Sequence, residues 1–135
     1  MSRLFEFMDF RNRKLVRTVQ IILGVFLIFL VVAGLLQLLP SPEYNEKAMA
    51  FLGALFAAGY LVYLMDLVFV LSGLMFIFDK WSAFGAVLLA PITVNIFFFH
   101  AFLDITGWIL ALIIILMNVY LGMVHWPRYR TMFSK

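Results

Sequence analysis

The sequence predicts an all-α integral membrane four-helix bundle with an extra short interfacial or re-entrant helix between its first and second spans. Hydrophobic residues make up 66% of the chain and charged residues 13%, whereas soluble domains carry about 25% charged residues. The mean hydropathy of +1.09 points the same way. Four apolar stretches approach the roughly 20 residues needed to cross about 30 Å of hydrocarbon. We therefore expect residues 1–135 to form a single transmembrane domain.

The basic residues are placed for contact with lipid. Lys and Arg number 10 and stand almost entirely at the two ends of the chain, which favours lipid headgroups over nucleic acid as the partner. The chain has no cysteine, which excludes disulfide exchange and Cys-ligated iron–sulfur clusters. His100 and His125 fall at opposite faces of the expected membrane, so no metal site is expected.

The sequence of the amino-terminal region predicts an interfacial segment followed by the first span. Residues 1–17 place apolar side chains before a basic run, a composition typical of a cytoplasmic membrane surface. The span runs over about 19–39, with Gln37 as its polar outer end and Pro40 as its stop. Small residues mark the places where another backbone can approach it closely: Gly24, Ala33 and Gly34.

A short helix is expected over about 42–58. Ser41 and Pro42 read as a capping hydroxyl followed by proline at the first helical position. Its apolar part is too short to span, which favours an interfacial or re-entrant segment. Gly59 predicts a break, although one bent helix over 42–78 remains an alternative. A stripe of small side chains predicts tight packing against another helix: Ala50, Gly53, Ala54, Ala57 and Ala58.

Three more spans are expected over about 60–78, 81–102 and 108–125. Asp79 and Lys80 form the turn between the first two. Pro91 removes a backbone donor and predicts a kink near mid-membrane. Trp126 and the basic residues after it are typical of an anchor at the membrane interface.

The distribution of Lys and Arg predicts the orientation. Nine of them fall at the two termini and the Asp79 turn, and only Lys47 falls on the other side. Because positive residues are retained in the cytoplasm, both termini of this multi-pass protein should be cytoplasmic.

Polar side chains within apolar sequence mark the candidate site, since an unsatisfied polar group in hydrocarbon costs several kcal/mol. Helical phase places Thr93, His100 and Asp104 on one face and Asn95 on another. The imidazole of His100 suits proton transfer, with a helix-end hydrogen bond to Asp104 as the alternative. For Asp66 the alternatives are proton transfer and an interhelical hydrogen bond. The candidate residues are Gln37, Asp66, Asn95, His100 and Asp104.

Two stretches, AMAFLGALFAAGY at 48–60 and APITVNIFFFHAFLD at 90–104, resemble the DoxX-like family of small four-span bacterial membrane proteins. The resemblance implies the bacterial inner membrane and a link to thiosulfate:quinone oxidoreductase subunits and membrane redox complexes. The family often has an Asn-Lys pair where this chain has Leu36 and Gln37. It also often has a lysine and a glutamate in the second span, where this chain has Asp66 and Phe69. These differences favour a packing role over inherited quinone chemistry.

The expected function is therefore an accessory subunit of a larger membrane complex, respiratory or redox, with no activity of its own and no cofactor. Its expected partners are membrane lipids and other membrane protein subunits, or a second copy of the chain. The alternatives are a quinone- or lipid-binding redox subunit, in which a partner carries the electrons, and a small transporter. Both alternatives use the polar candidate residues.

Overall fold

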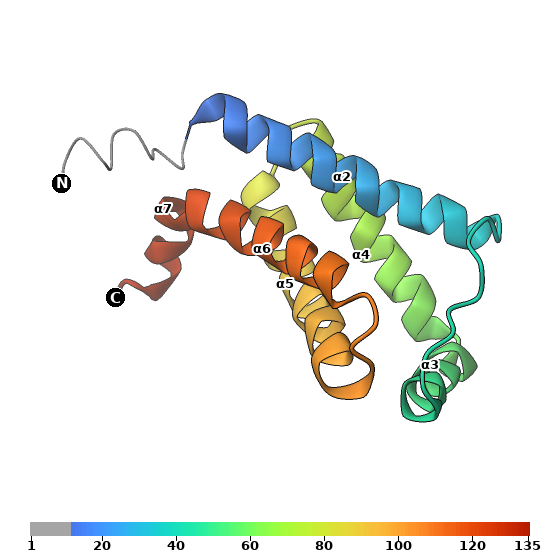
Figure 1. Ribbon diagram of the computed structural model, residues 1–135. Helices are drawn as coiled ribbons and strands as arrows, with labels where there is room; N and C mark the ends of the chain where they lie inside the picture. The colour runs from blue at the N-terminus through green and yellow to red at the C-terminus, as the bar shows by residue number, and fades with distance from the viewer. Residues whose placement is uncertain (1–11) are drawn as a thin grey trace.

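The computed structural model describes residues 12–135, and every regular element within them is a helix (Figure 1). The all-α prediction is confirmed for this part of the chain. The long helices are α2 (Arg13–Leu35), α4 (Tyr60–Ile77), α5 (Ser82–Phe98) and α6 (Trp108–Val124). The shorter elements are α3 (Glu46–Ala58), the π-helical turn η1 (Phe99–Leu103), α7 (Trp126–Tyr129) and the 3-10 turn η2 (Arg130–Phe133).

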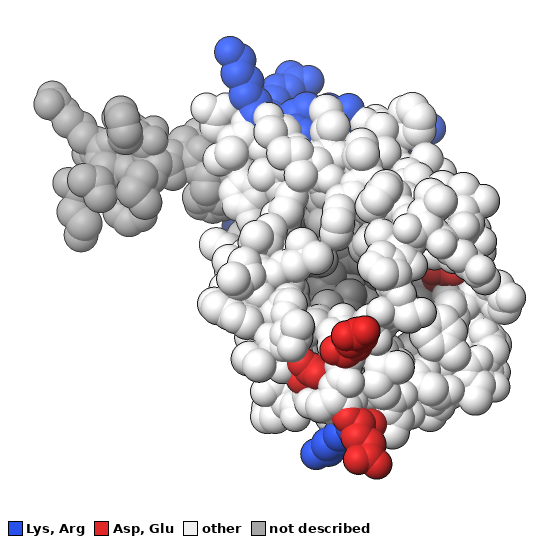
Figure 2. Space-filling view, turned by 45° about the vertical axis from the view of Figure 1, so that its right-hand side comes forward, with Lys and Arg blue, Asp and Glu red and all other residues white. Residues whose placement is uncertain are grey.

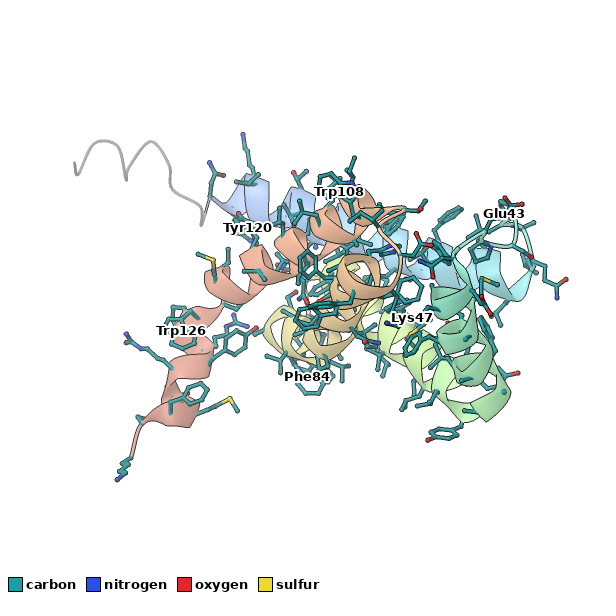
Figure 3. All side chains as sticks on the ribbon, turned by 60° about the horizontal axis from the view of Figure 1, so that its bottom comes forward. Glu43, Lys47, Phe84, Trp108, Tyr120 and Trp126 are labelled. Atoms are coloured by element: carbon teal, nitrogen blue, oxygen red, sulfur yellow. The ribbon has the colours of Figure 1, made fainter. Side chains whose placement is uncertain are left out.

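The long helices pack around a small apolar core. Helix α2 lies along α4, α5 packs against both α4 and α6, and α2 makes a lighter contact with α6. The best buried apolar side chains are at most 1% exposed: Leu23, Leu27, Phe76, Leu89 and Leu121. Outside this core the surface stays apolar. Phe84, for example, is 58% exposed and points outward from α5 (Figure 3).

Two glycines set the distance between α2 and α4. A Cβ atom built on Gly24 would lie 2.7 Å from the carbonyl oxygen of Gly73, and one on Gly73 would lie 2.9 Å from the carbonyl oxygen of Gly24. The close approach expected at Gly24 is therefore confirmed. Gly34 has open space around it instead.

Helix α2 starts and ends earlier than the predicted span over 19–39. It begins after Asn12, whose side chain accepts the Lys14 amide at 2.9 Å, and it ends at Leu35 before a turn in which Gln37 has a φ of 54°. The basic residues from Arg13 to Arg17 thus form the first turns of the long helix and no separate interfacial helix. Residues 1–11 of the predicted interfacial segment lie outside the described residues.

The short helix begins later than predicted. Its N-cap is Asn45, whose side chain accepts the Ala48 amide at 2.9 Å, so the predicted start at Ser41 and Pro42 is wrong. Gly59 separates α3 from α4 with a φ of 79°, which a glycine adopts without steric cost. Residues 42–78 therefore contain two helices.

The small-residue stripe of α3 does not pack against another helix within the described chain. All five of its members are exposed: Ala50, Gly53, Ala54, Ala57 and Ala58. The inward face instead presents Ala48, Leu52 and Leu55. Small size alone does not decide which face turns inward, because larger apolar side chains bury more area.

Helix α5 continues through Pro91, and the irregular turn lies after it, in η1. Two polar side chains form hydrogen bonds between α5 and α6 near the proline. Asn118 of α6 donates to the Ala86 carbonyl at 3.1 Å, and Thr93 donates to the Asn118 side chain at 2.6 Å. This buried pair joins α5 to α6. Helical hydrogen bonding thus continues past Pro91, and the regular α-helix gives way to the wide turn only after Phe98.

Three helices are long and apolar enough to cross a membrane: α2, α4 and α5 extended through η1. A fourth is counted when α6 is joined to the segment that follows it across a bend of 62°. After that bend the Tyr129 hydroxyl donates to the Ala83 carbonyl and ties α7 to the start of α5. The start of α2 and α7 lie at the same end of the molecule, and α3 lies at the other (Figure 1).

Candidate functional site

A cavity of about 320 Å³ lies between α3, the segment before it and the end of α5. Its walls are mostly apolar, and the polar side chains among its lining residues are those of Tyr44, Asn95 and His100. Its volume is at the lower end of the range of about 300 to 1,000 Å³ for small-molecule sites. The lining residues are Pro42, Tyr44, Phe51, Leu52, Leu55, Phe56, Met65, Asn95, Ile96, Phe99 and His100.

Aromatic rings form one wall of this cavity, which we call the α3 cavity. The ring of Phe99 meets Tyr44 edge-on, with 5.3 Å between centroids, and meets His100 in the same way at 5.1 Å. Phe51 from α3 adds a tilted contact to Phe99 at 5.8 Å. These contacts come from three separate segments, so the wall exists only when α3 is docked.

His100 is oriented by its neighbours. Its Nδ1 lies 3.2 Å from the Asp104 carbonyl oxygen, and because a carbonyl only accepts, Nδ1 carries the proton. The ring also packs on Gly107, where an added Cβ would lie 3.2 Å from the imidazole Cε1. In the neutral ring Nε2 is therefore left as an acceptor on a side chain that lines the α3 cavity.

Asp104 fastens α3 to the end of η1. Its carboxylate accepts the Asn45 amide at 2.6 Å and the Thr106 amide at 2.8 Å, while the Asn45 side chain donates to the Leu103 carbonyl. The hydrogen bond from Asn45, then those from Thr106, lower the pKa of Asp104 below its usual 3.8. The carboxylate is thus held ionised as the partner of a helix N-terminus.

Asp66 lies in a second cavity of about 500 Å³ between α2, α3 and α4. Phe56 and Met65 line both cavities and separate Asp66 from His100. Among the described residues the Asp66 carboxylate has no hydrogen-bond partner. It stands near Gly34 and Tyr63, so it faces the junction of α2 and α4.

The structure places the five candidate residues in different surroundings. Asn95 and His100 share the α3 cavity, Asp104 contacts His100 from outside it, and Asp66 occupies the adjoining cavity. Gln37 is exposed in the turn after α2 and lines neither cavity.

The helical phase predicted for α5 was wrong at its end. Thr93 points into the core toward α6, whereas Asn95 and His100 face the same cavity. The wide turn explains this, because η1 closes on a bond from the Asp104 amide to the Phe99 carbonyl, five residues back. Each π-helical turn holds more residues than an α-helical one, which shifts the phase of the side chains around it.

Sequence reasoning missed Tyr44 and Asn45. Tyr44 stands outside any helix, and no periodic pattern marks it as a cavity residue. Asn45 followed by Glu46 does carry a signal, since an asparagine cap and an acid in the first turn are typical of a helix start.

The described residues contain no group of three or more His, Cys, Asp or Glu side chains that could hold a metal ion. Charged side chains are sparse on the face drawn in Figure 2. There Lys and Arg gather mainly at one end, and Asp and Glu lie mainly toward the other. No family model, curated protein or solved structure matches this chain.

Proposed function

We propose that the chain is a four-span protein of the bacterial cytoplasmic membrane, with both ends cytoplasmic. Its spans are α2, α4, α5 with η1, and α6, arranged as a four-helix bundle, and α3 lies at the outer surface. The lengths and hydropathy of these helices support this arrangement, as do the many large apolar side chains exposed around them. Lipid is the solvent in which such a surface is stable.

We propose that the protein serves a membrane redox complex as an accessory subunit that holds a quinone-class ligand in the α3 cavity. The observation that carries this function is an aromatic-walled apolar cavity with three polar side chains. The resemblance of the sequence to the DoxX-like family supports the assignment to a redox complex. The electrons are carried by a partner subunit.

The lining groups suit a ring with two carbonyl oxygens. The Tyr44 hydroxyl and the Asn95 amide donate hydrogen bonds, which a quinone accepts. The Nε2 of His100 accepts, and so suits the hydroxyl of the reduced quinol. Phe99 offers a face for ring stacking, and the apolar walls formed by α3 suit an isoprenoid tail.

Binding of a short-tailed quinone to the purified chain tests this function. Asn95→Leu should weaken binding about two- to tenfold, the effect of one lost hydrogen bond. Phe99→Ala should weaken it further by removing the ring wall. Phe98→Ala is the matched control, because Phe98 is the neighbouring ring but is 48% exposed and lies outside the cavity.

A tail analogue without the carbonyl oxygens should bind at least tenfold more weakly than the quinone. Equal binding of the two would show that the cavity takes any apolar chain and would contradict the quinone assignment. Purification in a mild detergent, with identification of the proteins that co-purify, tests the accessory role. A redox enzyme subunit is the expected partner, and a chain that purifies alone would contradict that role.

A further inference from the structure

A third cavity, of about 400 Å³ and with a polar lining, lies at the opposite end of the molecule from α3. It is formed by the start of α2, the turn after α4 and the junction of α6 with α7. Its lining is Arg13, Val16, Arg17, Gln20, Asp79, Val124, His125 and Arg128. None of these residues belongs to the α3 cavity.

The charge of this cavity is unbalanced. Three guanidinium groups line it against one carboxylate, that of Asp79. Asp79 is also engaged locally, since its Oδ1 accepts the Ser82 hydroxyl at 3.3 Å. The cavity therefore carries excess positive charge, which favours an anion.

Of the three arginines that line the cavity, Arg17 stabilises the fold. Its Nη1 donates to the Phe76 carbonyl at 2.7 Å and its Nη2 donates to the Ile77 carbonyl. These bonds cap the end of α4, where carbonyl groups have no partner within the helix. Arg13 and Arg128 are exposed, and their guanidinium groups form no hydrogen bond with the described residues. Both groups can therefore bind a ligand.

Gln20 provides independent evidence for a ligand, because its side chain has a buried hydrogen-bond donor without a partner among the described residues. Its side chain is 1% exposed, and its Oε1 accepts a weak bond from Arg17 at 3.4 Å. Its Nε2 is buried and has no hydrogen-bond partner among the described residues. Leaving a buried donor without a partner destabilises the fold, so such a group points to an acceptor that completes the site.

We propose that this cavity binds a phosphoryl group. Arg13 and Arg128 present planar donors that match phosphate oxygens, and the Gln20 Nε2 donates from the cavity floor. The Nδ1 of His125 lies 2.8 Å from the Leu121 carbonyl oxygen and so carries a proton. That bond fixes the ring at the cavity wall. Asp79 opposes the anion and limits its affinity.

Two sources offer this chemistry, the headgroup of an acidic phospholipid and free phosphate. The test uses the full chain purified in a neutral detergent and titrated separately with phosphatidylglycerol, phosphatidylcholine and inorganic phosphate. Bound lipid is counted by native mass spectrometry, and affinity is taken from the shift of the unfolding temperature. Phosphatidylglycerol should bind at one site per chain and more tightly than phosphatidylcholine.

Matched substitutions separate the cavity from general surface charge. Arg13→Gln and Arg128→Gln should each weaken phosphatidylglycerol binding about fivefold, and together about twenty-five-fold. Lys14→Gln and Arg130→Gln remove the same charge from neighbouring positions outside the cavity and should change binding less than twofold. Gln20→Met should weaken binding while leaving the unliganded chain at least as stable.

Asp79→Asn should change the affinity for the phosphoryl group in the opposite direction from the arginine variants. It keeps an oxygen for Ser82 but removes the opposing charge, so it should tighten binding severalfold. Competition identifies the source: displacement of the lipid by millimolar inorganic phosphate supports a free-phosphate site, and resistance supports a lipid site. Equal losses in the cavity and control variants, or equal binding of the two lipids, would overturn the proposal. These measurements do not involve quinone, so they stand apart from the proposed function.

Discussion

Asp104 and Asp66 show how neighbours decide what a carboxylate does in apolar surroundings. Asp104 is 8% exposed and accepts two backbone amides, one of them from the N-cap of α3. Asp66 lines a cavity and has no hydrogen-bond partner among the described residues. The first is built into the structure, and the second is available to a ligand or proton.

We expect acid to weaken the contact between Asp104 and the start of α3. Because its folded-state pKa is lowered from 3.8, its contribution to stability is fully present above that value. That contribution is lost as the pH falls below 3.8 through the folded-state pKa. Unfolding of the wild type and Asp104→Asn should therefore differ at pH 5 and converge near pH 2. Glu43→Gln, in the exposed segment before α3, is the control, and a difference that persists in acid would contradict this role.

We expect substitutions of Asp66 to leave the stability of the fold unchanged. With no interhelical bond to lose, Asp66→Asn and Asp66→Leu should both change the unfolding free energy by less than about 0.5 kcal/mol. A loss of about 0.6 to 2 kcal/mol in Asp66→Leu alone would reveal a membrane hydrogen bond instead. If the host complex uses Asp66 to move protons, Asp66→Asn should stop turnover while assembly stays intact.

At the scale of elements, the contact between α2 and α4 depends on backbone proximity. Gly24→Ala and Gly73→Ala each place a methyl group within 3 Å of the opposite backbone, so the helices must separate. Each should destabilise the fold by about 1 to 3 kcal/mol, the usual cost of overpacking. Gly122→Ala in α6 is the control, because nothing lies within 4 Å of its added Cβ. Thermal unfolding in detergent measures the difference.

At the scale of the whole molecule, the two ends differ in chemistry. One end holds the arginine-lined cavity and the other holds α3 with its aromatic cavity. Glu43, just before α3, and Lys47, within α3, lie far from Trp126 at the opposite end (Figure 3). This separation is what the proposed orientation requires, in which the arginine-lined end faces the lipid headgroups on the side of the two termini.

The proposed orientation predicts a labelling pattern. Single cysteines at Ser2, Ser41 and Ser134 can be introduced without background, because the chain has no cysteine of its own. An impermeant thiol reagent added outside intact cells should label position 41 alone. Labelling of either terminal position would reverse the orientation and place the α3 cavity on the cytoplasmic side.

Sequence alone determined the features that depend on neighbouring residues. The apolar stretches predicted the long helices, and the last three predicted segments agree closely with the helices at Tyr60–Ile77, Ser82–Leu103 and Trp108–Val124. Gly59 and the turn at Asp79 were found because helix breakers act locally. The close approach at Gly24 was predicted from its missing side chain, but the same reasoning failed at Gly34, because a small residue permits a close approach without requiring one.

Only the tertiary structure decided which distant groups meet. Asp104 binds Asn45 across 59 residues of sequence, and Arg17 caps α4 across a similar separation. The inward face of α3 and the shared cavity of Asn95 and His100 depend on how helices pack and on one wide turn. Hydropathy records how apolar a residue is but not the direction its side chain takes, so these pairings follow from packing geometry alone.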